Sequence, residues 1–514
     1  MFSSSSFLFH DLSSFTNYFG TCRRLLQNIM DNSIQEGLLE RKEDVNLKKR
    51  IWMESKKIWS IAFPGIVARV TSFGVIVVTQ LFMGHIGVLP LAAYALEQTI
   101  FLRFVNGILI GMSSATETLC GQAYGAGQYH MMGIYLQRSW VVDGISATIL
   151  LPLFIFATPI LKLIGQQEAI AEEAGPISLW FIPFIYSFVF SLTIQMYLQS
   201  QMRNNIVGWL SAISFLFHLL LSWIMVIKLN LGVGGAIGAM SISSWLMIIG
   251  EFVYIFGGWC PDTWKGFTTA AFGDILPVIK LSISSGVMIC LELWYTSVLV
   301  LLAGYMKNAT TQISAFSICL NVSLWEFMIC LGLLGAASVR VSNELGRGDA
   351  KATKFSIKVI LAISICIGVF FFIMCLIFGR QIASLFTDSE EIAELVSDLS
   401  VLLAFSILFN SIQPVLSGVA VGAGLQTMVA YVNLGCYYVV GVPIGVILGY
   451  LFHLQVKGLW IGLLSGVVMQ SVILSYLIWR TDWNEQVNKA SERLNRWFLG
   501  PKEGDGNSDG AQEK

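Results

Sequence analysis

The chain has 514 residues, of which 55% are hydrophobic and only 12% are charged. An average soluble domain carries about 25% charged residues because its surface is solvated, so this composition excludes a protein whose whole surface faces water and indicates the lipid bilayer as the main partner. The formal net charge of −1 argues against the basic surface that a nucleic-acid-binding protein requires.

The N-terminal segment is polar. Residues 1–56 mix both signs of charge and include the charge-dense stretch 41–50, which is typical of segments that cannot bury enough apolar surface to fold. We predict a cytoplasmic, largely disordered tail. Residues 1–29 are rich in Ser and loosely resemble a transit peptide; an extended start, with Met30 opening the chain proper, is the alternative interpretation.

Apolar runs follow the tail. Each is close to the length of about 20 residues that a helix needs to cross a bilayer, and lipid offers no partner to the free backbone groups of other conformations. We therefore predict an all-α integral membrane protein with about twelve transmembrane helices. The predicted spans are 57–84, 91–117, 133–159, 174–198, 205–228, 234–257, 274–303, 311–337, 354–379, 397–423, 427–452 and 458–480. They divide into an N-lobe (57–257), an inter-lobe loop (258–273) and a C-lobe (274–480), with a cytoplasmic tail (481–514).

The placement of Lys and Arg predicts the orientation. Of the 31 Lys and Arg residues, 24 fall in the tails and loops on the side of the termini, and five fall on the other side. Cytoplasmic loops carry an excess of these residues, so we expect both termini to be cytoplasmic.

The two halves repeat. Residues 120–127, between spans 2 and 3, correspond to residues 342–348, between spans 8 and 9, at an offset of about 222. Residues 233–235 and 456–458, which precede spans 6 and 12, correspond at an offset of 223. Six spans per half give both halves the same orientation, so we predict two six-helix lobes related by a pseudo-twofold axis along the membrane normal, with a substrate path between them.

Four segments resemble the signature motifs of plant multidrug and toxic compound extrusion (MATE) transporters. They are Ala115–Ala126, Cys290–Tyr295, Val339–Gly346 and Gln413–Ala420. The resemblance covers about residues 50–498. It implies a cation-coupled antiporter that exports organic solutes, which in plants include flavonoids, alkaloids and organic acids, usually against a proton gradient. Some plant members of the family conduct anions at the vacuolar membrane.

Acidic side chains inside the membrane are candidates for proton coupling, because burying them is costly. Glu292 lies in the middle of span 7, and its motif resembles the one in which the family has a proton-binding glutamate; a purely structural hydrogen bond is the alternative. Many relatives place an aspartate where this chain has Asn410, which cannot titrate. We expect Asn410 to lie level with Glu292 and to share a hydrogen bond with it. Glu326 in span 8, with Asn321 about one turn away, is a second candidate or an interhelical contact.

Two arginines are also predicted to lie inside spans. Arg69 and Arg103 are each about 12 residues into spans 1 and 2, and a guanidinium group stays charged, so each requires an anion or water. Either could pair with Glu97; alternatively, both could contact an anionic substrate or permeating anion. Gln80 ends span 1, where bacterial relatives tend to carry a coupling aspartate, and a polar contact between helices is its other interpretation.

Further residues are candidates for the substrate path or for bending. Trp294 and Tyr438 could line a path for flat organic solutes, although packing would also explain them. Proline removes a backbone donor and bends a helix, so hinges or static kinks are expected at Pro64, Pro277, Pro414 and Pro443.

The sequence does not suggest an enzyme. It has no GxxxxGK[ST] phosphate-binding loop and no His spacing typical of metal ligands, so we expect no cofactor, with the proton as coupling ion. The predicted function is a monomeric antiporter for organic solutes or anions in the vacuolar or plasma membrane. The alternative is a chloride-like anion channel or uniporter on the same scaffold.

Overall fold

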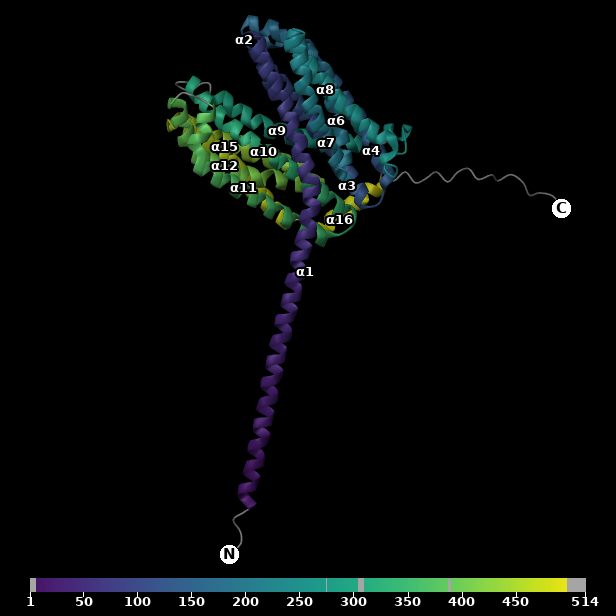
Figure 1. Ribbon diagram of the computed structural model, residues 1–514, viewed down its shortest axis with the longest axis vertical. Helices are drawn as coiled ribbons and strands as arrows, with labels where there is room; N and C mark the ends of the chain where they lie inside the picture. Colours follow the sequence, from purple (N-terminus) through teal and green to yellow (C-terminus); the bar gives the residue numbers. More distant parts are fainter. Residues whose placement is uncertain (1–5, 274, 304–308, 387–389, 497–514) are drawn as a thin grey trace, which may run out of the picture. The chain divides into compact units, whose positions relative to one another are not determined.

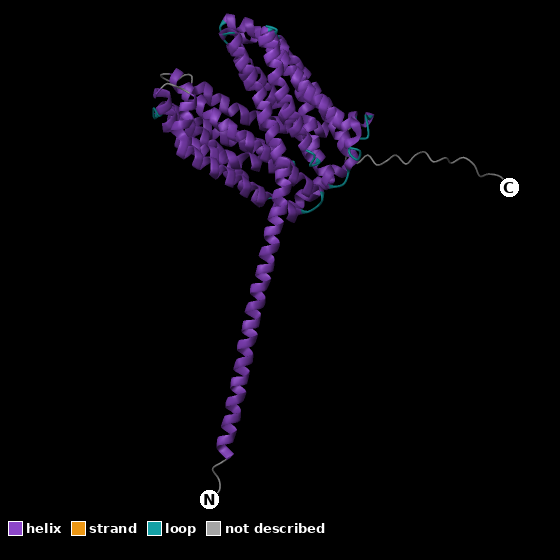
Figure 2. Cartoon of the chain, viewed as in Figure 1, coloured by secondary structure: helices purple, strands orange, loops and turns teal. Residues whose placement is uncertain are grey.

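The computed structural model describes residues 6–273, 275–303, 309–386 and 390–496 (Figure 1). Throughout these ranges the chain consists of helices joined by short loops, with no strand (Figure 2). The longer helices are α1 (Ser6–Ile86), α3 (Arg103–Gly125), α4 (Tyr129–Ile155), α6 (Glu168–Ser200), α7 (Asn205–Ser222), α8 (Gly232–Tyr254), α9 (Leu276–Ala303), α10 (Ala309–Gly346), α11 (Ala350–Phe386), α12 (Glu390–Ala423), α15 (Gln455–Arg480) and α16 (Trp483–Arg496). The shorter ones are α2 (Val88–Glu97), α5 (Ala157–Leu163), α13 (Gln426–Asn433) and α14 (Val442–Val446).

The predicted all-α membrane fold is confirmed. Twelve helical stretches among the described residues are long and apolar enough to cross a membrane. The fifth, Asn205–Lys228, coincides with the predicted span, and the seventh, Leu276–Ala303, begins two residues later than predicted. Several spans contain π-helical turns. These are η1 (Gln98–Leu102), η2 (Trp223–Lys228), η3 (Ile255–Trp259), η5 (Leu434–Gly441) and η6 (Ile447–Leu451), and a 3₁₀ turn, η4 (Thr269–Phe272), lies in the inter-lobe loop.

The chain divides into two compact units, residues 1–57 and 58–514. The first unit differs from the predicted disordered tail, because α1 is helical from Ser6 onward. This segment contains no Pro, and its second half is rich in Leu, Glu, Lys and Arg, which are good helix formers. The ends of the two predicted tails, residues 1–5 and 497–514, lie outside the described residues.

The second unit contains the two lobes. The N-lobe extends from residue 58 to η3, and the C-lobe consists of α9 to α15; Figure 1 shows them as a blue-to-teal bundle and a green-to-yellow bundle. Each lobe has a buried apolar core of its own, with Phe181 in the N-lobe and Trp460 in the C-lobe among the largest fully buried side chains. Because lipid tails are as apolar as these side chains, close van der Waals packing stabilises the two cores, and removal from water does not.

The structure shows the repeat in side-chain detail. A Cβ atom on Gly125 would lie 2.0 Å from the carbonyl oxygen of Asn343, and a Cβ atom on Gly346 would lie 2.1 Å from that of Gln122. The two glycines are 221 residues apart, and so are their two partners. The pseudo-twofold relation therefore has an offset of 221, close to the predicted 222, and it requires glycine at both crossing points.

Two aromatic pairs follow the same symmetry. The rings of Phe104 and Trp294 lie 5.2 Å apart, and those of Phe73 and Trp325 also lie 5.2 Å apart. Phe73 and Trp294 are 221 residues apart, as are Phe104 and Trp325. Each pair joins one helix of the N-lobe to one helix of the C-lobe, so the lobes meet symmetrically in the middle of their spans.

Helix α16 identifies one side of the second unit, which we call the α16 side. Trp483 and Ala490 belong to an apolar cluster formed mainly by the C-lobe, whereas Leu494 belongs to a cluster that contains Leu119 of the N-lobe. Nη1 of Arg493 donates to the carbonyl oxygen of Ala423 at 3.2 Å. The predicted C-terminal tail therefore begins with a packed helix that contacts both lobes.

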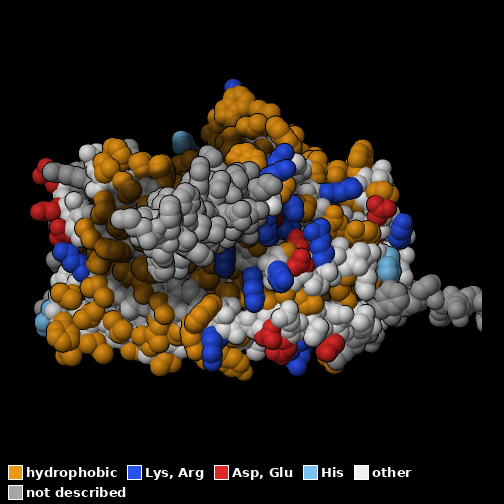
Figure 3. Space-filling model, turned by 90° about the horizontal axis from the view of Figure 1, so that it is seen from below, with side chains coloured by type: hydrophobic (Ala, Val, Ile, Leu, Met, Phe, Trp, Pro, Cys, Tyr) orange, Lys and Arg blue, Asp and Glu red, His pale blue; other side chains and the backbone are white. Residues whose placement is uncertain are grey.

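Lys and Arg side chains gather on this side. Figure 3 views the molecule from below and shows basic side chains distributed among apolar ones. Exposed basic residues in the loops and helix ends of the α16 side are Arg203, Lys265, Lys280, Arg347, Lys351, Lys354, Arg480 and Lys489.

The predicted hinge prolines lie at different kinds of position. Pro64 and Pro414 are inside α1 and α12. Pro277 is the second residue of α9, where a proline costs no backbone hydrogen bond. Pro443 is the second residue of α14, which continues η5 without a break, so it lies inside the helical span Gln426–Leu451. Bending is therefore expected at Pro64, Pro414 and Pro443.

Candidate functional site

The C-lobe positions a carboxyl group inside the membrane-spanning bundle. Glu292 is half-buried in the middle of α9. Nε2 of Gln413, on α12, donates to Oε1 of Glu292 at 3.2 Å. The same amide group donates to Oγ of Ser417 at 3.2 Å, one turn further along α12. Glu292 therefore has an amide donor that is itself held in place.

The predicted hydrogen bond between Asn410 and Glu292 is not formed, and Gln413 takes that place. Asn410 is half-buried and has no hydrogen bond to the described part of the chain. Asn410 was predicted to lie level with Glu292 from its distance to the predicted start of its span. Because α12 begins at Glu390 instead of residue 397, Asn410 lies further from the end of its helix than expected. Asn410 and Gln413 lie one turn apart on the same helix face, and the longer Gln side chain reaches the carboxyl group.

A buried network fixes the helix that carries Glu292. The hydroxyl group of Tyr438 donates to the carbonyl oxygen of Leu291 at 3.1 Å, and Nδ2 of Asn433 donates to that of Met288 at 3.1 Å. Nε2 of Gln470 in turn donates to Oδ1 of Asn433 at 2.6 Å. Tyr438 thus anchors the backbone beside Glu292, and its place in a path for flat solutes stays a prediction.

Glu326 forms a separate acidic site. It is 3% exposed, and its Oε1 accepts hydrogen bonds from Sγ of Cys330 at 2.7 Å and from Oγ of Ser411 at 3.1 Å. Ser411 and Gln413 are two residues apart on α12, which places them on nearly opposite faces of the helix. Glu292 and Glu326 therefore contact different sides of α12 and do not form a carboxyl pair.

The arginines do not pair with Glu97, which corrects the predicted ion pair. Glu97 is fully buried and accepts a hydrogen bond from Ser178 on α6. Nη1 of Arg103 instead donates across the lobes to Oγ of Ser297 at 3.2 Å. Glu97 and Arg103 are six residues apart, about 1.7 helical turns, so their side chains do not share a face. Arg69 lines a cavity in the N-lobe.

The remaining predicted path residues lie apart from one another. Gln80 is exposed and lines a shallow depression with His85. Asn321 is exposed on α10. Trp294 stacks on Phe104 of the opposite lobe, with ring planes 5° apart. Gln80 and Asn321 are therefore exposed, whereas Trp294 lies on α9, the helix that carries Glu292, and Arg103 and Tyr438 both contact that helix.

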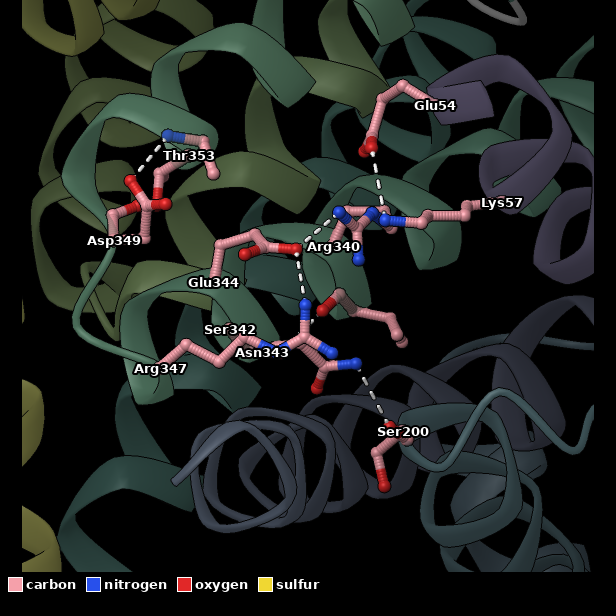
Figure 4. Close-up of polar contacts among 12 residues, drawn as sticks. Glu54, Lys57, Ser200, Arg340, Ser342, Asn343, Glu344, Arg347, Asp349 and Thr353 are labelled. Carbon is pink, nitrogen blue, oxygen red and sulfur yellow. Dashed lines mark hydrogen bonds and ion pairs between the residues drawn. The ribbon is translucent and has the colours of Figure 1, made fainter. Parts of the chain in front are cut away.

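Contacts on the α16 side join the lobes. Oγ1 of Thr118 donates to the carbonyl oxygen of Val421 at 2.7 Å, and Nε2 of Gln122 donates to that of Gly422 at 3.2 Å. Nδ2 of Asn343 donates to the carbonyl oxygen of Ser200 at 3.3 Å (Figure 4). Main-chain acceptors require close and specific approach of the backbones, so these bonds hold the lobes together where α3 and α10 end.

An ion-pair cluster stabilises the end of α10 at the same place. Oε1 of Glu344 lies 2.5 Å from Nη2 of Arg340 and 3.2 Å from Nη1 of Arg347 (Figure 4). Arg340 and Glu344 are almost fully buried. A buried carboxylate paired in this way orders the helix end that contacts the N-lobe.

Similarity to known proteins identifies this two-lobe arrangement. The profile of the MatE family matches residues 64–224 and, separately, residues 285–447. The two matches begin 221 residues apart, the offset of the structural repeat. The chain belongs to the MatE family.

Curated relatives and solved structures agree with this assignment. Protein DETOXIFICATION 24 of Arabidopsis thaliana is 56% identical over 92% of this chain and 95% of its own length. Protein DETOXIFICATION 25 of the same plant is 56% identical over 90% of this chain and 93% of its own length. The crystal structure of the eukaryotic MATE transporter AtDTX14 matches with a TM-score of 0.81 at 32% identity, covering 86% of this chain and 99% of the other. The MATE transporter VcmN of Vibrio cholerae, in its bent form, has the same fold, with a TM-score of 0.71 at 19% identity, covering 87% of this chain and 99% of the other. The resemblance inferred from the sequence motifs is confirmed, and the chain is a multi-pass membrane transporter of a family of transporters, not of enzymes.

Sequence reasoning missed the groups that surround Glu292 in this MatE protein. Gln413 belongs to the motif Gln413–Ala420, but it is 121 residues from Glu292 in the chain, so their contact could not be predicted from spacing. Asn433 and Gln470 are fully buried amides within apolar spans. Both could have been predicted to form hydrogen bonds, because a polar side chain inside a membrane span requires a partner.

Replacing Gln413 by Leu tests which amide supports Glu292. A buried carboxylate that loses a hydrogen-bond donor is destabilised by about 1–3 kcal/mol, so transport driven by a pH gradient is expected to slow by roughly tenfold. Asn410→Leu is expected to slow it less, because Asn410 makes no hydrogen bond to Glu292. The measurement is the initial uptake rate in proteoliposomes from pH 5 to pH 8. A larger loss of rate in Asn410→Leu than in Gln413→Leu would show that Asn410, and not Gln413, supports Glu292.

Proposed function

We propose that this MatE protein is a secondary antiporter that exports organic solutes or xenobiotics from the cytosol in exchange for protons. The observation that carries the proposal is a half-buried carboxyl group, Glu292, held by Gln413 inside the bundle. A carboxyl group in this setting can bind a proton from one side of the membrane and release it to the other. No second carboxyl group pairs with it among the described residues, so the proposal assigns the proton to Glu292.

Alternating access between the lobes would supply the transport step. The contacts that join α3 to the C-lobe run from Arg103, through the aromatic pair at Phe104, to Gly125 at the α16 side. In Figure 1 the two bundles separate beyond this region. A transporter of this kind must break the α16-side contacts and close the opposite side to complete its cycle.

The charge distribution supports an orientation for this cycle. Basic side chains are concentrated on the α16 side (Figure 3), and cytoplasmic loops of membrane proteins are enriched in them. We place the α16 side and both termini in the cytosol, at the vacuolar or the plasma membrane. The state described here would then be closed to the cytosol.

An anion channel on the same scaffold is the rival function. A channel requires a continuous path in its conducting state, whereas backbone atoms of the two lobes approach closely at Gly125 and Gly346. These crossings hold the lobes together at the α16 side, as an alternating-access cycle requires of one of its states. A gated channel in its closed state would share them, so a transport measurement has to distinguish the two functions.

Uptake of permanently charged solutes distinguishes the two functions. Tetraethylammonium and 3-phenylpropane-1-sulfonate do not distribute passively with pH, because neither has a neutral form near pH 7. Proteoliposomes with an acidic lumen, at zero membrane potential, are expected to accumulate at least one of them above its external concentration. A flux that follows the membrane voltage and never exceeds equilibrium would contradict antiport and support a channel.

A further inference from the structure

The N-lobe contains a cavity that the proposed proton site does not use. Its volume is about 220 Å³, and it lies among α1, α3, α6, α7 and α8, with one wall formed by α10. The lining combines apolar and polar side chains. Aromatic lining residues are Phe73, Phe184 and Phe188, and polar ones include Arg69, Ser72, Ser191, Gln195, Ser211 and Ser244.

Arg69 is the charged side chain of this cavity. Its guanidinium group forms no hydrogen bond or ion pair with any other residue in the part of the chain that the structure describes, and no Asp or Glu is found among the residues that line the cavity. Glu117 acts on Arg69 electrostatically, but the Glu117 carboxyl accepts its hydrogen bond from Nε2 of Gln199 at 2.9 Å. A guanidinium group stays charged and presents five N–H donors, so the N–H groups of Arg69 are available to an anion, while Glu117 offsets part of its charge.

Neighbouring groups add donors. Nε2 of Gln195 donates to Oγ of Ser191 at 2.7 Å, which uses one of its two N–H groups and leaves the second. The Ser191 hydroxyl accepts this bond, so its own proton is available to a ligand. The Ser187 and Ser214 hydroxyls, by contrast, already donate to backbone carbonyl oxygens at 2.6 and 2.7 Å. The free donors of the cavity therefore include groups of Arg69, Ser191 and Gln195.

The internal repeat relates this cavity to the proton site. Thr71 lines the cavity and is 221 residues before Glu292, so the two residues occupy equivalent places in their lobes. The C-lobe has an acid there, whereas the N-lobe has a neutral hydroxyl two residues from a fixed cation. Arg69 itself corresponds to Cys290, so each charged residue has a neutral counterpart in the other lobe.

We infer that the Arg69 cavity is a binding site for amphipathic organic anions, with a sulfonate or carboxylate at Arg69 and an aromatic or aliphatic body against the phenylalanines. This deepens, and rests on, the proposed function, because it names the substrate class of the antiporter. Arg69 supplies a charge-assisted, two-point contact. Ser191 and Gln195 donate to the remaining oxygens of the anion.

The wall formed by α10 links occupancy of the site to the conformation of the lobes. Met328 and Leu331 of α10 line the cavity, and Trp325, one turn from Met328, packs on Phe73 of α1. Separation of α10 from α1 would remove one wall of the cavity. A bound anion therefore favours the state in which this wall is in place, as expected for a transported substrate.

Binding to the purified full chain tests the inference. The probe is 3-phenylpropane-1-sulfonate, and the matched neutral probe is 3-phenylpropane-1-sulfonamide, both titrated by isothermal calorimetry in detergent at pH 7. Arg69→Gln is expected to weaken sulfonate binding by about 10- to 100-fold, the loss typical of a charge-assisted hydrogen-bonded contact, and to leave sulfonamide binding within about twofold. Arg69→Lys is expected to recover most of the sulfonate affinity.

Three comparisons make the result decisive. Sulfonamide binding shows that Arg69→Gln is folded. Arg203→Gln makes the same change at an exposed arginine outside the cavity, and this variant is expected to bind the sulfonate with unchanged affinity. Unchanged sulfonate binding in Arg69→Gln, or equal loss in Arg203→Gln, would overturn the inference. Glu292→Gln separates it from the proposed function, because sulfonate binding should persist when uphill transport is lost. Arg69-dependent binding by a wild-type protein that does not respond to pH would support the anion site and refute proton antiport.

Discussion

Glu292→Gln is expected to abolish accumulation of any transported solute under an imposed pH difference. Glutamine preserves the size of the side chain and can still accept the hydrogen bond from Gln413 through its Oε1. It cannot bind or release a proton, so the pH gradient has no group on which to act. Uphill uptake in proteoliposomes should fall to the level of protein-free liposomes.

A surface acid provides the matched control. Glu172 is exposed on α6, 2.9 Å from Nζ of Lys162, and exposed ion pairs contribute little, about 0–1 kcal/mol. Glu172→Gln is expected to accumulate solute like the wild type. Retention of uphill uptake by Glu292→Gln, with equal amounts of reconstituted protein, would remove Glu292 from the coupling mechanism.

Gly125→Ala is expected to slow transport by about tenfold or more. The added Cβ would lie 2.0 Å from the carbonyl oxygen of Asn343, a distance at which backbone atoms must move. Overpacking of this kind costs about 1–3 kcal/mol, and the cost falls on the state in which the α16 side is closed. Because every cycle passes through that state, both the initial exchange rate and the thermal stability of the purified protein should decrease.

The symmetry of the lobes extends this prediction. Gly346→Ala places a Cβ 2.1 Å from the carbonyl oxygen of Gln122 and should have a similar effect. Gly144 is a helical glycine whose Cβ would meet no atom within 4 Å, so Gly144→Ala is the control and should behave like the wild type. If Gly125→Ala transports at the wild-type rate, the close crossing is not part of the cycle.

The fold was predictable because membrane spans leave a strong signal in a sequence. Apolar runs predict which segments lie in lipid, and the uneven distribution of Lys and Arg predicts which loops face the cytoplasm. Both can be counted without knowledge of the tertiary structure. The tails were less predictable. A polar composition does not distinguish a disordered segment from a continuing helix such as the start of α1, and the packed helix α16 follows directly after Arg480.

The candidate site was only partly predictable. Glu292 stands out as an acid inside an apolar span, but its partner depends on the tilt and start of another helix, which a count of residues cannot supply. The partners found for Glu97 and Arg103, Ser178 on α6 and Ser297 on α9, likewise depend on the packing of other helices. Arg69 was identified from the sequence, whereas the cavity around it depends on five other helices.

The number of protons exchanged per solute tests the account most directly, since it assigns coupling to one carboxyl group. The measurement is the steady-state accumulation ratio of a transported, permanently charged solute at zero membrane potential over a series of imposed pH differences. One proton per solute predicts a ratio that changes about tenfold for each pH unit. A ratio independent of pH would contradict coupling, and a change of about a hundredfold per unit would require a second proton site besides Glu292.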